Sequence, residues 1–506
     1  MALAKTFAAA LTGITGHVVT AEANIGPGLP GIHMVGLGDT AVRESRERIR
    51  TAVANADLPW PKTKIVVSLS PAGLPKRGSH FDLAIALAVL AARNEQAAAR
   101  LQRVLVLGEL GLDGQIKPVP GVLPSLLAGQ RAGFDTAIIP AGNAFEAALI
   151  DDMTVLTATT LIDAWHFASA GMALPPTASA PAVSTLTDLD FADIAGQPHA
   201  KLAAEVAAAG GHHMFMVGPP GSGKSMVAER IPTILPELSR SAALDVAAVR
   251  SVAATGLDDD TTRAPFIAPH HTITRAGLVG GGQGTAAPGA ISMAHHGVLF
   301  LDEVSEIPAR VLDGLRIPLE HGRIRLQRNH EVTTYPAEFQ LVLAANPCRC
   351  GAEEAVACTC SVAERAKHLH NVSGPLLDRI DIHVETTSRG ASVSLADAEP
   401  SSLIAQRVAQ ARDRARHRWS NACLPYDLNA RVPSTYLRRH APADEAGMAL
   451  LEAHLAGGAV TQRGIDKALK LAWTLCDLDG NSSPDLDHVA RALDLRTPTS
   501  QAMKVA

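Results

Sequence analysis

Hydrophobic and polar positions divide the chain into three regions. Up to about residue 170, short apolar runs at 64–70, 103–110 and 136–141 predict strands, and helical stretches separate them. Residues 39–56 place apolar side chains on one face and arginines on the others, which predicts a surface helix. A second α/β pattern follows from about 190 to 386, and the remainder is helical. The overall prediction is therefore α/β, with a helical C-terminal part.

These shifts of pattern predict the domain organisation. We expect an N-terminal α+β domain at 1–170, a linker rich in Pro, Ala, Ser and Thr at 171–190, an α/β domain at 191–388 and a helical lid at 389–506. A length of 506 residues suits two to four domains, and 47% hydrophobic content suffices for buried cores.

Composition excludes several functional classes. The net charge of −5 argues against a globally basic nucleic-acid binder, and 3% aromatic residues argue against a base-stacking platform. We find no apolar run of ~18 residues that could cross a membrane. The N-terminus resembles a signal peptide only superficially, because Thr and Gly interrupt its apolar run. Six cysteines, four of them clustered, favour a reducing compartment, so we expect a cytoplasmic protein.

A phosphate-binding loop is the strongest chemical signal. An apolar strand leads into G-x-x-x-x-G-K-S, and a helix follows. Glycines let backbone N–H groups wrap phosphates at the start of the helix, the lysine reaches the β- and γ-phosphates, and the serine hydroxyl binds Mg²⁺. The predicted ATP site comprises Gly218, Pro219, Pro220, Gly221, Ser222, Gly223, Lys224 and Ser225.

Two further apolar strands end in polar residues that suit ATP hydrolysis. Residues 297–301 lead to Asp302, which we expect to hold Mg²⁺, and to Glu303, which we expect to polarise the attacking water. Residues 341–345 lead to Asn346, whose amide can orient that water. Arg379 could stabilise the transferring phosphoryl group from a neighbouring subunit, and Arg463 could reach back to the nucleotide. Alternatively, each arginine serves the fold, Arg379 in a local salt bridge and Arg463 as a solvated helix residue.

Together these residues resemble the AAA+ ATPases of the magnesium-chelatase branch, and the whole chain resembles the YifB/ComM family of competence-associated DNA helicases. The blocks "AHHGVLFLDE", "LRIPLEHGRIRLQR", "AANPCRCG" and "SGPLLDRIDIHVE" carry the resemblance. It implies a hexameric ring, with Asp302 and Glu303 as Walker B, Asn346 as sensor 1, Arg379 as arginine finger and Arg463 as sensor 2. It also implies ATP-driven branch migration on DNA. The alternatives are a chelatase-type motor that remodels a protein or metal-insertion partner, and a non-enzymatic scaffold.

The N-terminal domain resembles the Lon-protease fold, which the recombination protein RadA also uses. A Lon-type site needs a serine nucleophile and a lysine base in hydrogen-bond reach. By register, His80 occupies the nucleophile position and Leu123 the base position, while Ser79 lies one residue away. We therefore expect no proteolysis, and a role in scaffolding the ring or guiding DNA.

Two basic segments are candidates for holding DNA. Residues 321–339 alternate like a hairpin, with Arg323 and Arg325 on one face of a strand and Arg328 near its end. The helix at 401–419 carries Arg407, Arg412, Arg414, Arg416 and Arg418, opposed only by Asp413. For the hairpin, the alternative is a set of salt bridges between subunits, and for the helix it is a solvated face. The glycine-rich stretch 277–290 could form a pore loop.

A cysteine cluster follows Asn346 directly. Cys348, Cys350, Cys358 and Cys360 form C-x-C-x₇-C-x-C, and four thiolates can bind Zn²⁺ tetrahedrally. The usual spacing is C-x₂-C, so reduced thiols without metal are the alternative, and His368 or His370 could substitute as ligands. For the adjacent histidines 270–271 and 295–296 we prefer structural or nucleotide-loop roles.

Overall fold

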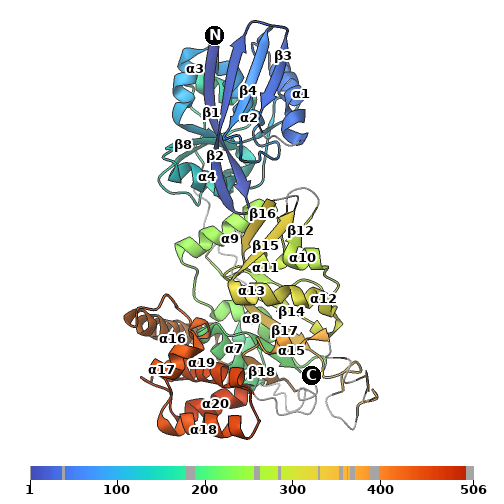
Figure 1. The fold of residues 1–506 in the computed structure, drawn as a ribbon, viewed down its shortest axis with the longest axis vertical. Coiled ribbons are helices and arrows are strands. Elements are labelled where there is room, and N and C mark those ends of the chain that lie inside the picture. The colour runs from blue at the N-terminus through green and yellow to red at the C-terminus, as the bar shows by residue number, and fades with distance from the viewer. Residues whose placement is uncertain are drawn as a thin grey trace.

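The computed structural model describes residues 2–36, 40–177, 189–255, 262–282, 286–328, 331–352, 357–361, 363–364, 368, 371–387 and 398–496. The three modules follow one another along an elongated molecule, with the N-terminal module at one end and the helical lid at the other (Figure 1). Most of the predicted linker, residues 178–188, lies outside the described ranges.

The N-terminal module is built on a seven-stranded sheet in the order β3-β4-β2-β1-β5-β8-β9. Its strands are β1 Ala2–Thr12, β2 Thr15–Gly26, β3 Gly31–Val35, β4 Lys64–Ser70, β5 Val104–Val106, β8 Thr136–Pro140 and β9 Thr154–Ala158. The helices α1 Thr40–Asn55, α2 Asp82–Ala91, α3 Glu95–Arg100, α4 Val122–Arg131 and α6 Leu161–Ala170 accompany it. The strand and helix predictions for this region are confirmed, with Val42, Ile49 and Val53 of α1 buried as expected.

The middle module is built on a five-stranded parallel sheet in the order β11-β14-β17-β10-β18. Its strands are β10 Met214–Val217, β11 Phe266–Ile267, β14 Val298–Leu301, β17 Gln340–Ala345 and β18 Ile382–Glu385. The β10 strand lies between β17 and β18, so its carboxyl end opens beside both neighbours. Ligands of such sheets bind at the carboxyl ends of the strands.

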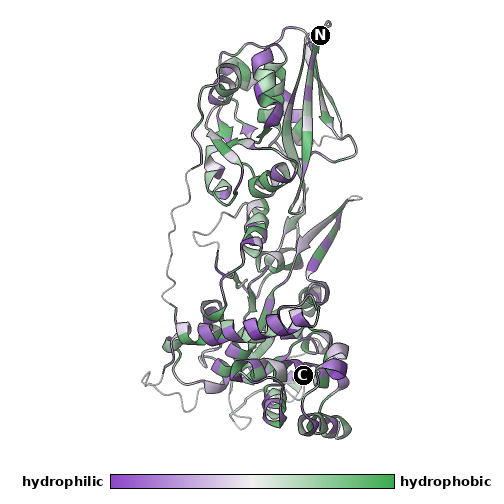
Figure 2. Cartoon of the chain, turned by 90° about the vertical axis from the view of Figure 1, so that its left-hand side faces the viewer, coloured by the Kyte–Doolittle hydropathy of each residue, from purple (hydrophilic) through white to green (hydrophobic). Residues whose placement is uncertain are grey.

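Helices cover both faces of this sheet. The helices α7 Pro198–Gly210 and α8 Lys224–Ile234 share a core with the lid, whereas α10 Arg275–Val279, α11 Ala290–Met293 and α12 Ala309–Leu312 share one with the other face. A hairpin of β15 Arg323–Arg328 and β16 Glu331–Pro336 is inserted between β14 and β17. It stands out from the body of the module in Figure 2.

The lid consists of α16 Ser401–Asn421, α17 Ser434–His440, α18 Glu445–Ala456, α19 Gln462–Asp479 and α20 Leu486–Arg496. The rings of Trp419 and Trp473 meet edge to face in its core, 5.6 Å apart. Because α16 and α19 pack against α7, the lid is fixed to the middle module by a shared apolar core.

The first two modules meet through α9 Arg240–Ala253. Gly121, at the start of α4, donates its N–H to the Ser251 carbonyl at 3.0 Å. Arg240 pairs with Asp151 at 2.7 Å. Gly13, at the turn between β1 and β2, lies so close to Thr334 of β16 that a Cβ there would come within 2.3 Å of its carbonyl oxygen. The N-terminal module therefore also touches the inserted hairpin.

Candidate nucleotide-binding site

The loop between β10 and α8 has the backbone that a phosphate cradle needs. Gly221 and Gly223 adopt left-handed φ values of 76° and 84°, which side chains rarely tolerate. Gly218 has no room for a side chain, because a Cβ would lie 2.0 Å from the Thr386 hydroxyl. The predicted loop residues 218–223 thus form one turn that ends at the first residue of α8, where helix N–H groups favour an anion.

Lys224 lies inside this loop. Its ammonium donates to the carbonyls of Gly218 at 2.7 Å and Pro219 at 2.8 Å, and to Asn346 Oδ1 at 3.2 Å. Burial lowers the pKa of Lys224. The contact with Asn346 shows that the predicted lysine and the predicted water-orienting amide occupy the same corner, although 122 positions separate them.

The carboxyl end of β14 brings the metal-binding candidates to this corner. Ser225 donates its hydroxyl to Asp302 Oδ2 at 2.7 Å, and Asp302 Oδ1 accepts the backbone N–H of Glu303 at 2.8 Å. A hydroxyl and a carboxylate beside a phosphate cradle are the donors that Mg²⁺ takes in this class of site. Ser225 and Asp302 therefore fit the ion that ATP would bring.

Glu303 occupies a strained position at the same edge. Its φ is 47°, in the left-handed region that non-glycine residues rarely adopt, and its carboxylate pairs with His271 at 2.9 Å. His271 lies on the segment between β11 and α10, and β11 is the neighbour of β14 in the sheet. The sequence assigned this histidine a nucleotide-loop or structural role but did not identify its partner, because nothing local links positions 271 and 303.

Arg379 and Arg463 lie near the amino end of β18, at the end of the sheet opposite the phosphate loop. Arg379 pairs with Glu320, and Arg463, at the start of α19, pairs with Asp378. The carboxyl end of β18 reaches the phosphate loop, since Thr386 bonds Ser222 at 2.6 Å. At about 3.3 Å per residue, the four residues of β18 place Asp378 more than roughly 13 Å from that end. In this structure Arg463 is paired with Asp378, and a role at the nucleotide stays a prediction.

The N-terminal module places other residues at the positions of a Lon-type dyad. His80 bonds the Ala9 carbonyl at 2.8 Å, Leu123 is fully buried, and Ser79 pairs with Glu109. Lys76, the buried lysine of this loop, donates to the Pro71 carbonyl. A serine paired with a carboxylate and a lysine held by a carbonyl are not in the arrangement of a serine–lysine dyad.

The hairpin places its arginines on two faces. Arg323 and Arg325 are exposed and flank the buried Ile324, which confirms that they share one face. Arg328 is turned the other way and donates to the Gly282 carbonyl. Within the described ranges, the side chains of Arg323 and Arg325 have no hydrogen-bond or ion-pair partner.

The arginines of α16 are used inside the fold. Arg412 donates twice to the Ala208 carbonyl of α7, at 2.6 and 2.9 Å, and burial lowers its pKa to about 10. Arg407 pairs with Glu205 and Glu399, and Arg418 pairs with Asp477. The interpretation of this helix as a DNA-facing stripe is corrected at these three positions, because packing against α7 and α19 uses their charges. Arg416 stays exposed and pairs with Asp413 at 2.8 Å.

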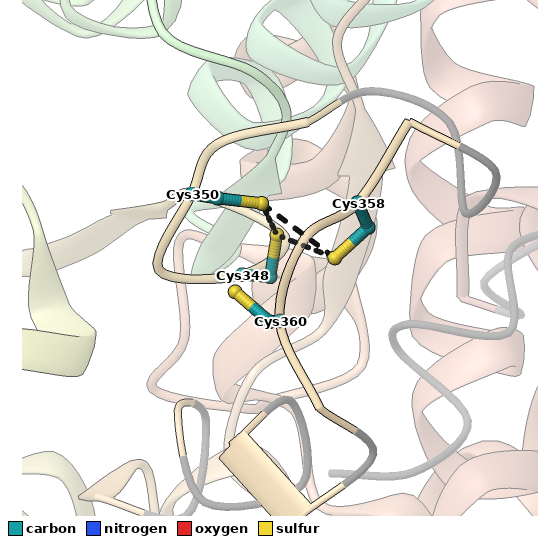
Figure 3. Close-up of side chains that lie close together, drawn as sticks. All are labelled: Cys348, Cys350, Cys358 and Cys360. Atoms are coloured by element: carbon teal, nitrogen blue, oxygen red, sulfur yellow. Dashed lines mark hydrogen bonds between the residues drawn. The ribbon is translucent and has the colours of Figure 1, made fainter.

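The four cysteines converge at one point beside the nucleotide site (Figure 3). Their sulfur atoms lie within 4.8 Å of one another, with Cys348 Sγ 3.2 Å from Cys350 Sγ and 3.5 Å from Cys358 Sγ. The backbone N–H of Ala352 helps lower the pKa of Cys350 to about 5. His368 instead bonds the Asn346 carbonyl at 3.2 Å, and His370 lies outside the described residues.

The other histidine pair, His295 and His296, lies beside Asp245 of α9. His295 accepts the Glu338 backbone N–H at 3.1 Å, and burial lowers its pKa to about 3. Together with His296, it comes within 4.8 Å of Asp245. The contact with Glu338 gives His295 a structural role, as expected.

The predicted glycine-rich stretch forms the end of α10 and the short strands β12 Gly280–Gly281 and β13 Ala287–Pro288, while 283–285 lie outside the described ranges.

Comparison with known proteins agrees with this geometry. The family described as magnesium chelatase, subunit ChlI, matches residues 190–393, with related matches at 21–143 and 398–496. An uncharacterized protein of Mycobacterium tuberculosis is 47% identical over 98% of this chain and 99% of its own. The competence protein ComM of Haemophilus influenzae is 36% identical over 100% of both chains, and the uncharacterized protein YifB of Escherichia coli is 36% identical over 98% of this chain and 97% of its own.

A Lon protease of Mycolicibacterium smegmatis is 32% identical over 143 residues, which are 26% of this chain and 18% of that protein, and the similarity falls in the N-terminal region. Among the helices that the structure describes, none is both long and apolar enough to cross a membrane.

Proposed function

This chain belongs to the YifB/ComM family of magnesium-chelatase-like AAA+ ATPases, and on that premise we propose that it is an ATP-driven ring motor that acts on DNA in the cytoplasm. The observation that carries the proposal is the convergence of Lys224, Ser225, Asp302 and Asn346 at one sheet edge. Within the site, Lys224 holds the β- and γ-phosphates and Asp302 holds Mg²⁺. Glu303 takes a proton from the attacking water, which Asn346 orients.

The position of two arginines supports the proposal of a ring. Arg379 and Arg463 lie at the sheet edge away from the chain's own phosphate loop. In a ring, which we take to be a hexamer, this edge faces the phosphate loop of the next subunit. There, Arg379 serves as arginine finger and Arg463 as a second cation for the developing negative charge. Their present partners, Glu320 and Asp378, are then exchanged for phosphate oxygens.

The hairpin is the part of the motor that we assign to DNA. Arg323 and Arg325 present two guanidinium groups on one exposed face, with no partner among the residues that the structure describes, which suits contact with a phosphate backbone. The resemblance of this insert to pore hairpins favours single-stranded or branched DNA and branch migration, and the name of the competence protein ComM favours a role in natural transformation. The cofactors of this motor are ATP and Mg²⁺. We also assign Zn²⁺ to the four cysteines.

The test is ATP hydrolysis by the purified chain without DNA and with single-stranded, duplex or four-way-junction DNA. We expect stimulation by single-stranded or junction DNA, and its loss in Glu303→Gln. Hydrolysis that no DNA changes would contradict the DNA assignment. It would favour the alternative of a chelatase-type motor, which remodels a protein or metal-insertion partner. Absence of hydrolysis under all conditions would favour the scaffold.

A further inference from the structure

The cysteine cluster lies against the nucleotide site and shares its backbone. Cys348 follows Asn346 by two residues, and Asn346 accepts a hydrogen bond from Lys224. Gly351, next to Cys350, lies against Pro220 of the phosphate loop, because a Cβ on Gly351 would come within 2.7 Å of the proline ring. The loop that carries the cysteines therefore forms one wall of the phosphate cradle.

The sulfur atoms fit a single tetrahedral ion. A Zn–S bond of about 2.3 Å separates two sulfur atoms of a tetrahedral site by about 3.8 Å. The separations among the sulfur atoms of Cys348, Cys350 and Cys358 are 3.2, 3.5 and 3.6 Å, somewhat shorter than this value, and all four sulfur atoms lie within 4.8 Å of one another. Figure 3 shows the four side chains gathered in one place, with dashed lines joining the sulfur atoms of Cys348, Cys350 and Cys358. Four converging thiols are a donor set for thiophilic Zn²⁺ and not for Mg²⁺.

We propose that Zn²⁺ held by Cys348, Cys350, Cys358 and Cys360 acts as a clamp on the ATP site, so that nucleotide binding depends on zinc. On binding, the thiols that are protonated release their protons and four Zn–S bonds form. The ion joins residues 348–350 to residues 358–360 and so fixes the segment between Asn346 and Gly351. This proposal rests on the nucleotide site assigned above and adds its regulation.

In this arrangement, zinc acts by holding the segment after Asn346 in place. Without the ion, the four thiols lack a common bond, and the segment after Asn346 relies on weaker contacts such as the hydrogen bond from Gly351 N to Cys348 O at 3.0 Å. The wall against Pro220 and the orientation of Asn346 then both loosen. Removing partners that position a metal site typically costs 10–100-fold, and we expect a loss of about tenfold in ATP affinity by the same logic.

The first experiment measures metal content and nucleotide binding in the full chain. We expect about one zinc ion per chain, and an ATP affinity about tenfold lower after a chelator has removed the zinc and has itself been dialysed away. Re-addition of Zn²⁺, and not of extra Mg²⁺, restores binding. The Cys348→Ser, Cys358→Ser double variant loses both zinc and affinity. A wild-type chain without zinc, or a double variant that binds ATP normally, would overturn the proposal.

A second pair of variants separates the clamp from simple folding. Gly351→Ala leaves every thiol in place but pushes against Pro220. Gly458→Ala is the matched control, because its φ of 67° is close to the 71° of Gly351 and a Cβ there meets nothing within 4 Å. We expect Gly351→Ala to retain zinc and lose ATP affinity, and Gly458→Ala to retain both. Normal affinity in Gly351→Ala would contradict the clamp. Because binding is measured instead of hydrolysis, failure of the motor proposal would show separately.

Discussion

The first two modules each contain a glycine-containing loop, a buried lysine in that loop and a helix that follows, but the two lysines have different surroundings. Lys224 meets two carbonyls of its own loop and the amide of Asn346, with a carboxylate-bound serine next to it. Lys76 meets the Pro71 carbonyl, and the nearby Ser79 pairs with Glu109. The loop around Lys224 gathers the groups needed for phosphoryl transfer, whereas the loop around Lys76 does not assemble a serine–lysine dyad.

The difference teaches that a buried lysine in a glycine loop does not define a site by itself. A site forms where neighbouring strands bring complementary groups to the same end of the sheet. In the middle module, β10, β14 and β17 run in parallel and end together. In the N-terminal module, the position that should supply a base is the buried Leu123. The contrast predicts that substitutions in the loop around Lys224 will impair ATP hydrolysis, whereas substitutions in the loop around Lys76 will leave it unchanged.

The largest effect should come from Arg379→Ala. Removal of an arginine finger costs about 10³-fold or more in turnover, and we expect ATP hydrolysis to fall accordingly. Mixing Arg379→Ala with Lys224→Ala subunits should restore part of the activity, since an intact phosphate loop can then face an intact arginine. Mixed rings that stay inactive, with both variants folded and assembled, would show that Arg379 does not act between subunits.

Glu303→Gln should have the next largest effect. Loss of a general base costs about 10²-fold or more in turnover, while ATP binding is retained because Lys224, Ser225 and Asp302 remain. Turnover measurements check the expected loss of hydrolysis, and equilibrium binding of a fluorescent ATP analogue checks that ATP binding is retained. Glu445→Gln, an exposed substitution in the first turn of α18, is the control. Equal turnover in Glu303→Gln and in this control would remove Glu303 from the catalytic site.

The hairpin substitutions Arg323→Ala and Arg325→Ala should leave basal hydrolysis intact and abolish stimulation by DNA. With each lost phosphate contact, the slope of log affinity against log salt should fall by about 0.9 for duplex or 0.7 for single strands. Salt-dependent DNA binding measures this. Arg416→Ala is the matched control, because that arginine is exposed but paired with Asp413. If Arg416→Ala weakened binding as much as the hairpin variants did, the DNA surface would have to include α16.

The smallest effect should come from Lys76→Met. The substitution removes a hydrogen bond to the Pro71 carbonyl, so the free energy of unfolding should change by only about 1 kcal/mol. ATP turnover should stay at the wild-type level, and neither protein should cleave peptide substrates. Thermal unfolding and the same hydrolysis assay measure both quantities. Loss of turnover in a folded Lys76→Met protein would break the contrast between the two lysines.

Sequence reasoning identified the groups of the nucleotide site because short motifs carry them. The string around Gly218–Ser225 and the strands that end at Asp302 and Asn346 each fix their own local geometry, and parallel pairing brings them together. The same locality explains the strands and α1 of the N-terminal module. His271 was not recognised as the partner of Glu303, because that contact arises only when the segment between β11 and α10 is placed beside the end of β14 in the fold.

The corrected predictions concern contacts between distant segments. The arginines of α16 look unopposed in sequence, but Glu205 and Ala208 of α7 lie about two hundred positions earlier. The docking of α19 pairs Arg463 with Asp378, a contact that the sequence did not predict, and its expected role at the nucleotide stays a prediction. In both cases, the position of the lid decided the outcome, and the lid is fixed by apolar packing that no short motif specifies.

The most direct test of the central claim is branch migration of a labelled four-way junction by the purified chain. We expect wild-type protein with ATP and Mg²⁺ to convert the junction to product, with no conversion without ATP, in Glu303→Gln or in Arg323→Ala, Arg325→Ala. Wild-type protein that hydrolyses ATP but leaves the junction unchanged at every protein concentration would contradict the account of this chain as a branch-migration motor.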